Sequence, residues 1–312
     1  DLDGTRLSGQ LEGKRVKELL ETIVGEVGLI FHNAKFDLRM LKHSGLIKDY
    51  IDPLWDSYLA SMFLNENEKH GLKYLWNSYC NDGKGKVAAY DDLFEKIPFN
   101  YIPIEVAYLY GAKDALMTYE LYKFQEKYLD PENEICISRG LKDAAILYQE
   151  TEIPLISIIA GMEDEGIKID LKYAKGLEKK YKKEMIELQK NVYEEISKLD
   201  LKEIPEELFK KLGNPINLNS PLQLSILIYD GLELRSPEKD MSRGTGEKIL
   251  KYYIDNNNYA DLFRAILDYR KIKKLMTTYI TKIPKLVRED TEKVHYNFNQ
   301  YGARTGRFSS SN

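Results

Sequence analysis

The sequence predicts an α/β domain over residues 1–130 and a mainly helical domain over residues 131–312. A short apolar run at residues 27–31 has the character of a buried strand and stands among segments with helical apolar spacing. Beyond the turn-rich residues 130–134, two long amphipathic segments flank a polar region interrupted by prolines. A length of 312 residues with 43% hydrophobic content is sufficient for two cores.

The elements of the first domain follow from their terminal signals. After the strand at residues 27–31, residues 33–45 read as a helix with Asn33 as its N-cap and Gly45 as its stop. Residues 56–64 and 104–124 also show helical spacing, which completes the α/β pattern.

The elements of the second domain predict an arm with a tip. Residues 150–165 read as a helix that Gly166 stops, followed by a short extended piece. Long helices are expected at residues 172–199 and 259–283, joined through a broken polar region. Residues 243–248, "RGTGEK", lack the spacing of a phosphate-binding loop and read as a turn before a helix.

Charge and composition limit the classes of function. The net charge is −4, but residues 261–312 carry eleven Lys/Arg against five Asp/Glu, a local +6 that suggests a polyanionic partner. By charge alone, a solvated, salt-bridged surface explains this segment as well. We expect no membrane span and no signal peptide, and we interpret Cys80 and Cys136 as reduced cytosolic thiols.

Two acidic residues are candidates for hydrolytic chemistry. Two-metal phosphodiester hydrolysis needs several carboxylates that converge on divalent cations from separate elements. Asp37 lies one turn after Asn33, and Asp114 lies one turn after Tyr110, whose phenol could orient the attacking water. Taken singly, Asn33 and Asp37 are also explained as helix-start residues, and Tyr110 and Asp114 as a core aromatic and an exposed acid.

Together, these motifs resemble those of a known family. "HNAKFD" at residues 32–37 and Y-x-x-x-D at 110–114 resemble the second and third motifs of the DEDD 3′–5′ exonucleases of the tyrosine subtype. Residues 55–75 resemble the segment between them in the proofreading domain of bacterial DNA polymerase I. The resemblance implies a ribonuclease H-like fold, with Asp37 and Asp114 as ligands of Mg²⁺ or Mn²⁺. It also implies that Tyr110 orients water and that Asn33 contacts the degraded strand.

One departure from the family pattern concerns its first motif. We find no strand carrying the Asp-x-Glu pair that supplies two further metal ligands, so we expect the exonuclease domain to be truncated at its N-terminus. "DLDGT" at residues 1–5 is no substitute, and it lacks the upstream strand that haloacid-dehalogenase phosphatases need. With half of its carboxylates, the site is expected to be incomplete and to bind Mg²⁺ poorly.

From residue 150 onward, the sequence resembles family A DNA polymerases. The resemblance implies a palm entry at residues 150–171, a thumb at 172–285 with the signature N-x-N-S-P-x-Q-L, and a partial palm strand and turn at 294–312 with T-G-R-x-S-S. Basic and hydroxyl side chains there can hold duplex phosphates without reading sequence, and an Arg in the minor groove can sense base-pair geometry. The DNA-binding candidates are Asn217, Asn219, Ser220, Arg270, Lys274, Thr277, Thr278, Thr305 and Arg307. For Arg270 and Lys274, a helix-surface salt bridge is the alternative.

The implied function is DNA-templated DNA synthesis with 3′–5′ proofreading. The family places its palm carboxylates and fingers after T-G-R-x-S-S, so this chain alone is expected to be inactive in synthesis and weak or inactive as an exonuclease. Expected partners are primer-template DNA and a single-stranded 3′ end, with a separate palm–fingers chain as a further candidate. The alternatives are a non-catalytic DNA-binding subunit and a stand-alone exonuclease of the ribonuclease D type. The expected location is the cytoplasm of a bacterial or phage-infected cell.

Overall fold

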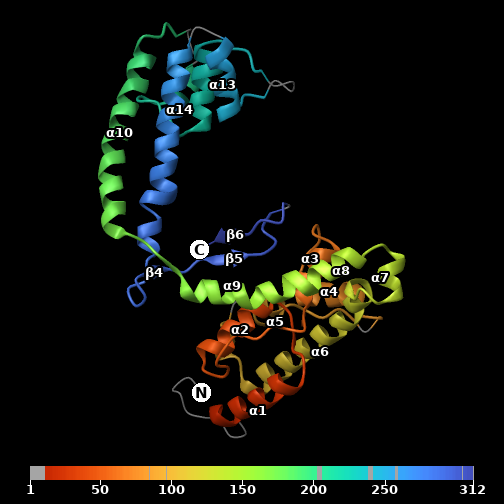
Figure 1. Cartoon of the computed structure of the whole chain (residues 1–312). Coiled ribbons are helices and arrows are strands. Elements are labelled where there is room, and N and C mark those ends of the chain that lie inside the picture. The colour runs from red at the N-terminus through yellow and green to blue at the C-terminus, as the bar shows by residue number, and fades with distance from the viewer. Residues whose placement is uncertain are drawn as a thin grey trace. The chain divides into compact units, whose positions relative to one another are not determined.

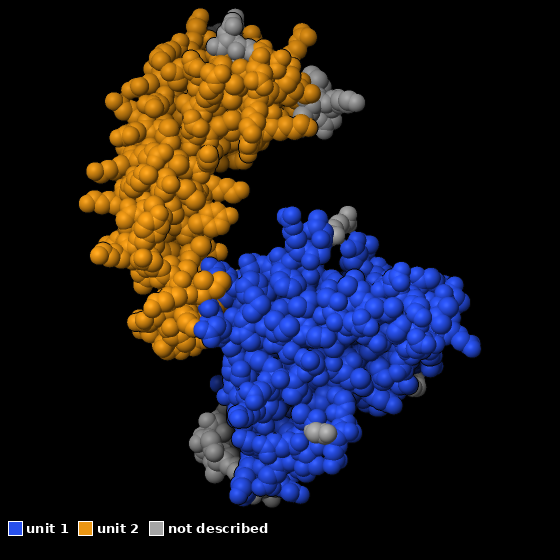
Figure 2. All heavy atoms as spheres, viewed as in Figure 1, with its two compact units in different colours: residues 1–166, 296–312 blue, residues 167–295 orange. Residues whose placement is uncertain are grey.

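The chain forms two compact units in the computed structural model (Figure 2). The structure describes residues 11–83, 85–95, 97–201, 206–237, 242–256, 259–303 and 305–311. One unit comprises residues 1–166 and 296–312, and the other comprises residues 167–295. The units thus divide the chain at Gly166 and Tyr296, whereas the sequence places its boundary after residue 130. "DLDGT" at residues 1–5 lies outside the described residues.

The first unit is built mainly of helices (Figure 1). Its α-helices are α1 (Gly13–Glu26), α2 (Ala34–His43), α3 (Ser57–Leu64), α4 (Leu72–Tyr79), α5 (Tyr90–Phe94), α6 (Ile104–Leu129), α7 (Glu134–Ser138), α8 (Lys142–Leu147) and α9 (Ile153–Glu165). A 3-10 turn, η1 (Phe99–Tyr101), precedes α6, and a π-helical turn, η2 (Tyr148–Glu152), joins α8 to α9. The predicted stop of α9 is confirmed, because Gly166 takes a φ of 66°, a conformation that a side chain disfavours.

A small parallel sheet sets the starts of two helices. β1 (Ile30–Phe31) is shorter than the predicted strand and pairs in parallel with β2 (Trp55–Asp56), which the sequence did not reveal. Helix α2 follows β1 and helix α3 follows β2, so both helices begin at the carboxyl end of this sheet. A helix start at this edge can hold polar groups, as in other α/β folds.

The core of the first unit packs around a buried tyrosine. Tyr148 is fully buried, and its ring lies edge-on to Trp55 and Phe63. Its hydroxyl accepts a hydrogen bond from the backbone N–H of Asp56 and donates one to the carbonyl of the same residue. The helix region after residue 130 is therefore tied directly to β2, which explains why residues 131–166 belong to this unit.

A β-hairpin completes the first unit. β5 (Asn297–Asn299) pairs antiparallel with β6 (Ser309–Ser311), and Phe298 lies opposite Ser310. A Cβ at Gly302 would lie 1.6 Å from the Ser309 hydroxyl oxygen, so the hairpin needs a glycine there.

The second unit is an arm built on two long helices, α10 (Leu171–Ser197) and α14 (Ala260–Leu275), which pack against each other (Figure 1). Before α10, β3 (Ile167–Lys168) pairs antiparallel with β4 (Lys293–Val294). The two ends of the arm therefore lie side by side. The remaining elements are α11 (Glu206–Leu212), α12 (Pro221–Ser225), η3 (Ile226–Gly231), α13 (Glu247–Asn256), η4 (Met276–Ile280) and η5 (Ile283–Leu286).

These elements confirm the predicted fold class, an α/β exonuclease segment followed by a mainly helical polymerase segment. A helix follows residues 243–246 as predicted, but it begins at Glu247, inside the segment 243–248 that the sequence assigns to the turn. Among the helices of the described residues, none has the length and apolar character needed to cross a membrane.

Candidate active site

Asp37 and Asp114 line one cavity of about 760 Å³ in the first unit. Asp37 stands in the first turn of α2, and Asp114 stands in the middle of α6. The cavity wall is otherwise largely apolar, with Phe31 from β1 and Leu72 from α4 among its members. Two carboxylates 77 positions apart in the sequence therefore face the same space.

The environment of Asp37 disfavours its charged form. Burial, followed by the nearby charge of Asp56, raises the pKa of the Asp37 carboxyl to about 6. Among the described residues, no ion pair to Asp37 is found. A cation that enters the cavity would therefore stabilise the charged form of the Asp37 carboxylate.

Asp56 is a structural residue that the sequence reasoning missed. Its carboxylate accepts hydrogen bonds from the backbone N–H groups of Asn33 (2.9 Å) and Ala34 (2.8 Å) at the start of α2. It also accepts from Tyr58 (2.9 Å) and Leu59 (3.2 Å) at the start of α3. Burial raises the pKa of Asp56, and the four N–H groups act against that rise. One buried side chain thus caps two helices and fixes the direction of α2.

This double cap corrects the prediction that the Asn33 side chain caps α2. Asn33 does occupy the N-cap position, but it has a φ of 73° and its side chain makes no capping hydrogen bond. The carboxylate of Asp56 meets the orphan N–H groups instead, because β2 delivers it to the same edge of the sheet. Residues in the left-handed region are often Asn, which explains this residue type here.

Lys73 links the two members of the predicted Y-x-x-x-D motif. Its ammonium group pairs with the Asp114 carboxylate and lies 4.3 Å from the centre of the Tyr110 ring. The Tyr110 ring also contacts Tyr90, Phe94 and Phe99. Tyr110 therefore lies in an aromatic cluster beside the cleft, and it is not among the residues that line the cavity.

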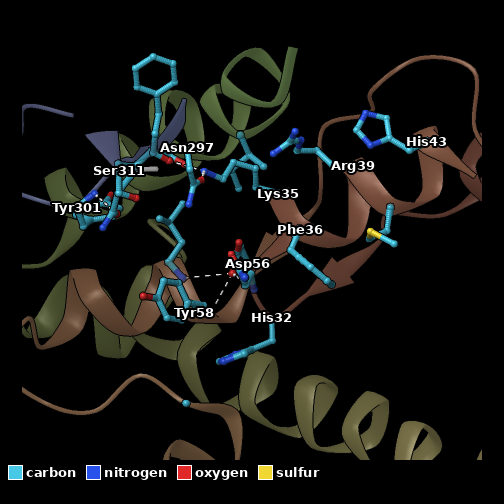
Figure 3. A pocket seen from close by; sticks show the side chains of 18 residues that line it. His32, Lys35, Phe36, Arg39, His43, Asp56, Tyr58, Asn297, Tyr301 and Ser311 are labelled. Atoms are coloured by element: carbon cyan, nitrogen blue, oxygen red, sulfur yellow. Dashed lines mark hydrogen bonds between the residues drawn. The ribbon is translucent and has the colours of Figure 1, made fainter. Parts of the chain in front are cut away.

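Asn33 lines a second cavity, of about 830 Å³, which also receives residues of α2. Figure 3 shows this second cavity with the side chains that line it. His32 and Met40 contribute to both cavities, whereas Asp37 faces only the first. The pKa of His32 is lowered to about 4, chiefly by burial, so its imidazole is neutral at pH 7.

Cationic side chains of α2 hold the end of α9 and the hairpin. The buried Glu163 of α9 accepts hydrogen bonds from Lys35 (2.6 Å), from Arg39 (2.7 Å) and from the backbone N–H of Phe298 (2.7 Å). Lys35 also donates to the side chain of Asn297 (2.8 Å), and Figure 3 shows the two side chains directed toward one another. The helix that carries Asp37 is therefore bonded to the hairpin that carries Arg307.

The donor set of the cleft does not fit a complete two-metal centre. Among the described residues, no group of three or more His, Cys, Asp or Glu side chains is arranged to hold a metal ion. Asp37 and Asp114 supply two carboxylates to the cavity, and one of these is paired with Lys73. Exonucleases and polymerases of these families use divalent metals.

Among the described residues, Arg270 makes no surface salt bridge, which was the alternative to a DNA contact, and it bonds backbone carbonyls instead. Its guanidinium donates to the backbone carbonyls of Leu218 (3.3 Å) and Thr245 (2.5 Å), and burial lowers its pKa. Arg270 thereby ties α14 to two loops at the tip of the arm. Because backbone carbonyls satisfy these donors, the structural role of Arg270 accounts for the residue without a phosphate contact.

The other predicted tip residues take part in turns. The Asn217 side chain accepts a hydrogen bond from the backbone N–H of Asn219 (3.0 Å), and Ser220 caps α12 through the N–H of Gln223 (3.3 Å). The Asn219 amide contacts the hydroxyl of Tyr269 (3.4 Å).

The remaining DNA-binding candidates are exposed. Lys274, Thr277 and Thr278 follow one another on α14 and η4 in the second unit. Thr305 and Arg307 lie in the connection between β5 and β6 in the first unit. The structure thus brings Asp37 and Asp114 together, and it distributes the DNA-binding candidates over both units.

Family comparisons cover almost the whole chain. Residues 7–130 match the family model for the 3′–5′ exonuclease, and residues 172–312 match the model for DNA polymerase family A. The two matches define a class of protein in which a proofreading-type nuclease domain precedes a polymerase domain. The chain belongs to family A of the DNA polymerases.

Two of the curated relatives that match the chain are bacterial enzymes. DNA polymerase I of Synechocystis sp. is 32% identical over 305 residues, which are 95% of this chain and 28% of the relative. DNA polymerase I of Borreliella burgdorferi is 29% identical over 91% of this chain and 28% of the relative. The chain therefore spans about 28% of the length of these relatives.

A solved structure shows the same fold. The POL domain of Pol1 from M. smegmatis, in complex with DNA primer-template and dNTP, aligns with 90% of this chain at a TM-score of 0.64 and 21% identity. The alignment covers 41% of that protein's chain.

Proposed function

We propose that this chain serves DNA-templated DNA synthesis with 3′–5′ proofreading, as the editing and primer-holding portion of a family A polymerase. One observation carries the proposal. Asp37 and Asp114, on separate helices, line one cavity in a chain whose two parts match an exonuclease family and a polymerase family.

In the proposed editing site, the cleft receives a single-stranded 3′ end. Asp37 and Asp114 are the proposed ligands of Mg²⁺ or Mn²⁺, which would supply a metal-bound water as nucleophile. Asn33 is the proposed contact to the strand, since it is exposed at the edge of the neighbouring cavity. Tyr110 is proposed to orient water from beside the cleft, and Lys73 fixes the position of its ring.

For primer holding, DNA contacts are proposed on each unit separately. Lys274, Thr277 and Thr278 are exposed on the arm, where cations and hydroxyls can meet duplex phosphates. Asn217, Asn219 and Ser220 remain proposed contacts at the tip through their remaining polar atoms. Thr305 and Arg307 are proposed to reach the minor groove near the primer end. Arg270 acts, in this proposal, by holding the tip in shape.

A fluorescence anisotropy titration with a labelled primer-template tests the DNA-binding part of this proposal. We expect binding that weakens steeply as salt rises from about 50 to 200 mM, because phosphate contacts release counterions. Binding that does not respond to salt would refute phosphate contacts by the arm.

A nucleotide-incorporation assay tests the assignment of synthesis to further parts of the protein. With primer-template, Mg²⁺ and all four dNTPs, we expect no extension by residues 1–312 alone. The proposed synthesis site uses palm carboxylates and fingers supplied outside these residues, on the same or on a separate chain. Extension by this chain would show that the catalytic carboxylates lie within residues 1–312. The cytoplasm is the compartment that the proposed function implies.

A second candidate is a DNA-binding portion without nuclease activity of its own. The ion pair between Lys73 and Asp114 favours it, because a carboxylate engaged with an ammonium group is a poorer metal ligand. Degradation of single-stranded DNA by wild type, but not by Asp114→Ala, would decide for the editing site.

A further inference from the structure

Lys73 lies beside the candidate cleft, where it contacts one of the two carboxylates that line the cavity. It comes from α4, and its side chain is 13% exposed, whereas that of Asp114 is 31% exposed. It makes an ion pair with the Asp114 carboxylate and a cation–π contact with the Tyr110 ring. The ammonium group is therefore largely withdrawn from water and has two partners that face it.

The two carboxylates of the cavity differ in their counterions. Asp114 has the ammonium group of Lys73, whereas Asp37 has no ion pair among the residues that the structure describes. With Lys73 charged, these three groups carry a net charge of −1. Without that charge, they carry −2. A divalent cation binding at Asp114 must therefore either displace Lys73 or accept its repulsion at short range.

The aromatic contact strengthens the hold of Lys73 on this position. An ammonium group over a ring face is attracted by the ring quadrupole, and the attraction grows as water is removed. The Tyr110 ring is itself packed against Tyr90 and Phe94, so it forms a fixed platform. Displacing Lys73 would break the ion pair and the cation–π contact together.

We propose that Lys73 is an internal counter-cation that competes with divalent metal ions for the Asp114 carboxylate. The proposal rests on the assignment of Asp37 and Asp114 to a metal-binding cleft. In this arrangement, metal binding and a movement of Lys73 away from Asp114 are one coupled event. Lys73 then lowers the affinity of the cleft for metal and stabilises the metal-free state.

The test is a titration of the full chain with Mn²⁺, in which electron paramagnetic resonance measures the concentration of the free ion. Lys73→Met keeps the length and apolar stem of the side chain and removes its charge. We expect this variant to bind Mn²⁺ about tenfold more tightly than wild type, because the repulsion acts at contact distance. Lys113→Met is the matched control, since it removes the same charge from an exposed neighbour of Asp114 on α6. It should change the affinity less than about twofold.

Two further variants distinguish competition from a general effect. Lys73→Arg keeps the charge and should bind Mn²⁺ like wild type. Lys73→Met combined with Asp114→Asn should lose the gain, because the carboxylate that was released is no longer present. Thermal unfolding provides a second reading: Lys73→Met should melt lower than wild type without metal and regain its melting temperature with Mn²⁺.

The outcomes separate this inference from the proposed function. If Lys73→Met binds Mn²⁺ no more tightly than wild type, or if Lys113→Met gains equally, the competition is refuted. Nuclease and primer-binding assays are independent of this result, because the Mn²⁺ measurement involves no DNA. A gain in affinity would support the role of Lys73 whether or not residues 1–312 alone degrade DNA.

Discussion

At the scale of single residues, Asp56 has the largest structural role that the sequence does not reveal. Its buried carboxylate satisfies four backbone N–H groups at the starts of α2 and α3. We expect Asp56→Ala to lower the free energy of unfolding by about 2–4 kcal/mol, since it leaves these donors without a partner. Urea denaturation measures this change. Asp56→Asn keeps the shape and one acceptor oxygen and should lose less, whereas a loss under about 0.5 kcal/mol for Asp56→Ala would contradict the double cap.

Asp37 gives a pH-dependent prediction. Its pKa is about 6 in the folded chain, above the ordinary Asp value of about 3.9, so the folded chain retains a proton that the unfolded chain releases between these values. Stability contributed by this group is thus full at low pH and is lost as pH rises through about 6. In EDTA, Asp37→Asn should therefore be more stable than wild type by about 1 kcal/mol at pH 7.5, after allowance for partial solvent screening.

The gain should shrink toward zero near pH 4, where the aspartate is neutral in the folded chain and about half protonated in the unfolded chain. Unfolding curves in urea at the two pH values provide the comparison. An equal difference between Asp37→Asn and wild type at both pH values would show that the environment of Asp37 does not disfavour its charge.

At the scale of elements, Lys35 and Arg39 make a matched pair on α2. Both bind Glu163, but only Lys35 also binds β5, through Asn297 and the carbonyl of Phe298. We expect Lys35→Met to raise the hydrogen-exchange rate of the hairpin amides at least about tenfold, because a local opening loses these bonds. Arg39→Met should leave hairpin exchange within about threefold of wild type. Equal effects of the two variants would contradict a specific link between α2 and the hairpin.

On the arm, Arg270 and Lys274 are expected to act through different properties. Arg270→Met removes two bonds to backbone carbonyls and should lower unfolding stability by about 1–3 kcal/mol. Lys274→Met changes an exposed side chain and should alter stability by less than about 0.5 kcal/mol. Denaturation of both variants checks this contrast, and comparable stability losses would show that the Arg270 bonds contribute nothing.

The sequence predicts most elements, because helix periodicity and stop signals are local. It predicts the stop of α9 at Gly166 and a helix following the turn at residues 243–248, where α13 begins at Glu247. It does not predict that Asp56 caps α2, because the cap joins residues more than twenty positions apart through β1 and β2. The hydrogen bonds from Arg270 to its carbonyl partners could not be predicted for the same reason, since these partners lie 52 and 25 positions away along the chain.

At the scale of the whole molecule, exposed cations of the arm should determine the salt dependence of DNA binding. If Lys274 contacts one phosphate, Lys274→Met should reduce the magnitude of the slope of log K against log [salt] by about 0.9 for duplex DNA. Anisotropy titrations at four salt concentrations give this slope. Exposed Lys113 on α6 serves as the control, and Lys113→Met should leave the slope unchanged. An unaltered slope for Lys274→Met would remove Lys274 from the DNA-binding surface.

The proposed editing site requires that Asp37 and Asp114 face one cleft. Intramolecular cross-linking measures this directly. In a Cys80→Ser background, with Cys136 buried, Asp37→Cys and Asp114→Cys should be joined by a short bifunctional thiol reagent, as seen in the mass of the intact chain. The pair Asp37→Cys and Lys113→Cys should react with the reagent singly and remain unlinked. Efficient linking of the control pair, or none between positions 37 and 114, would contradict the shared cleft.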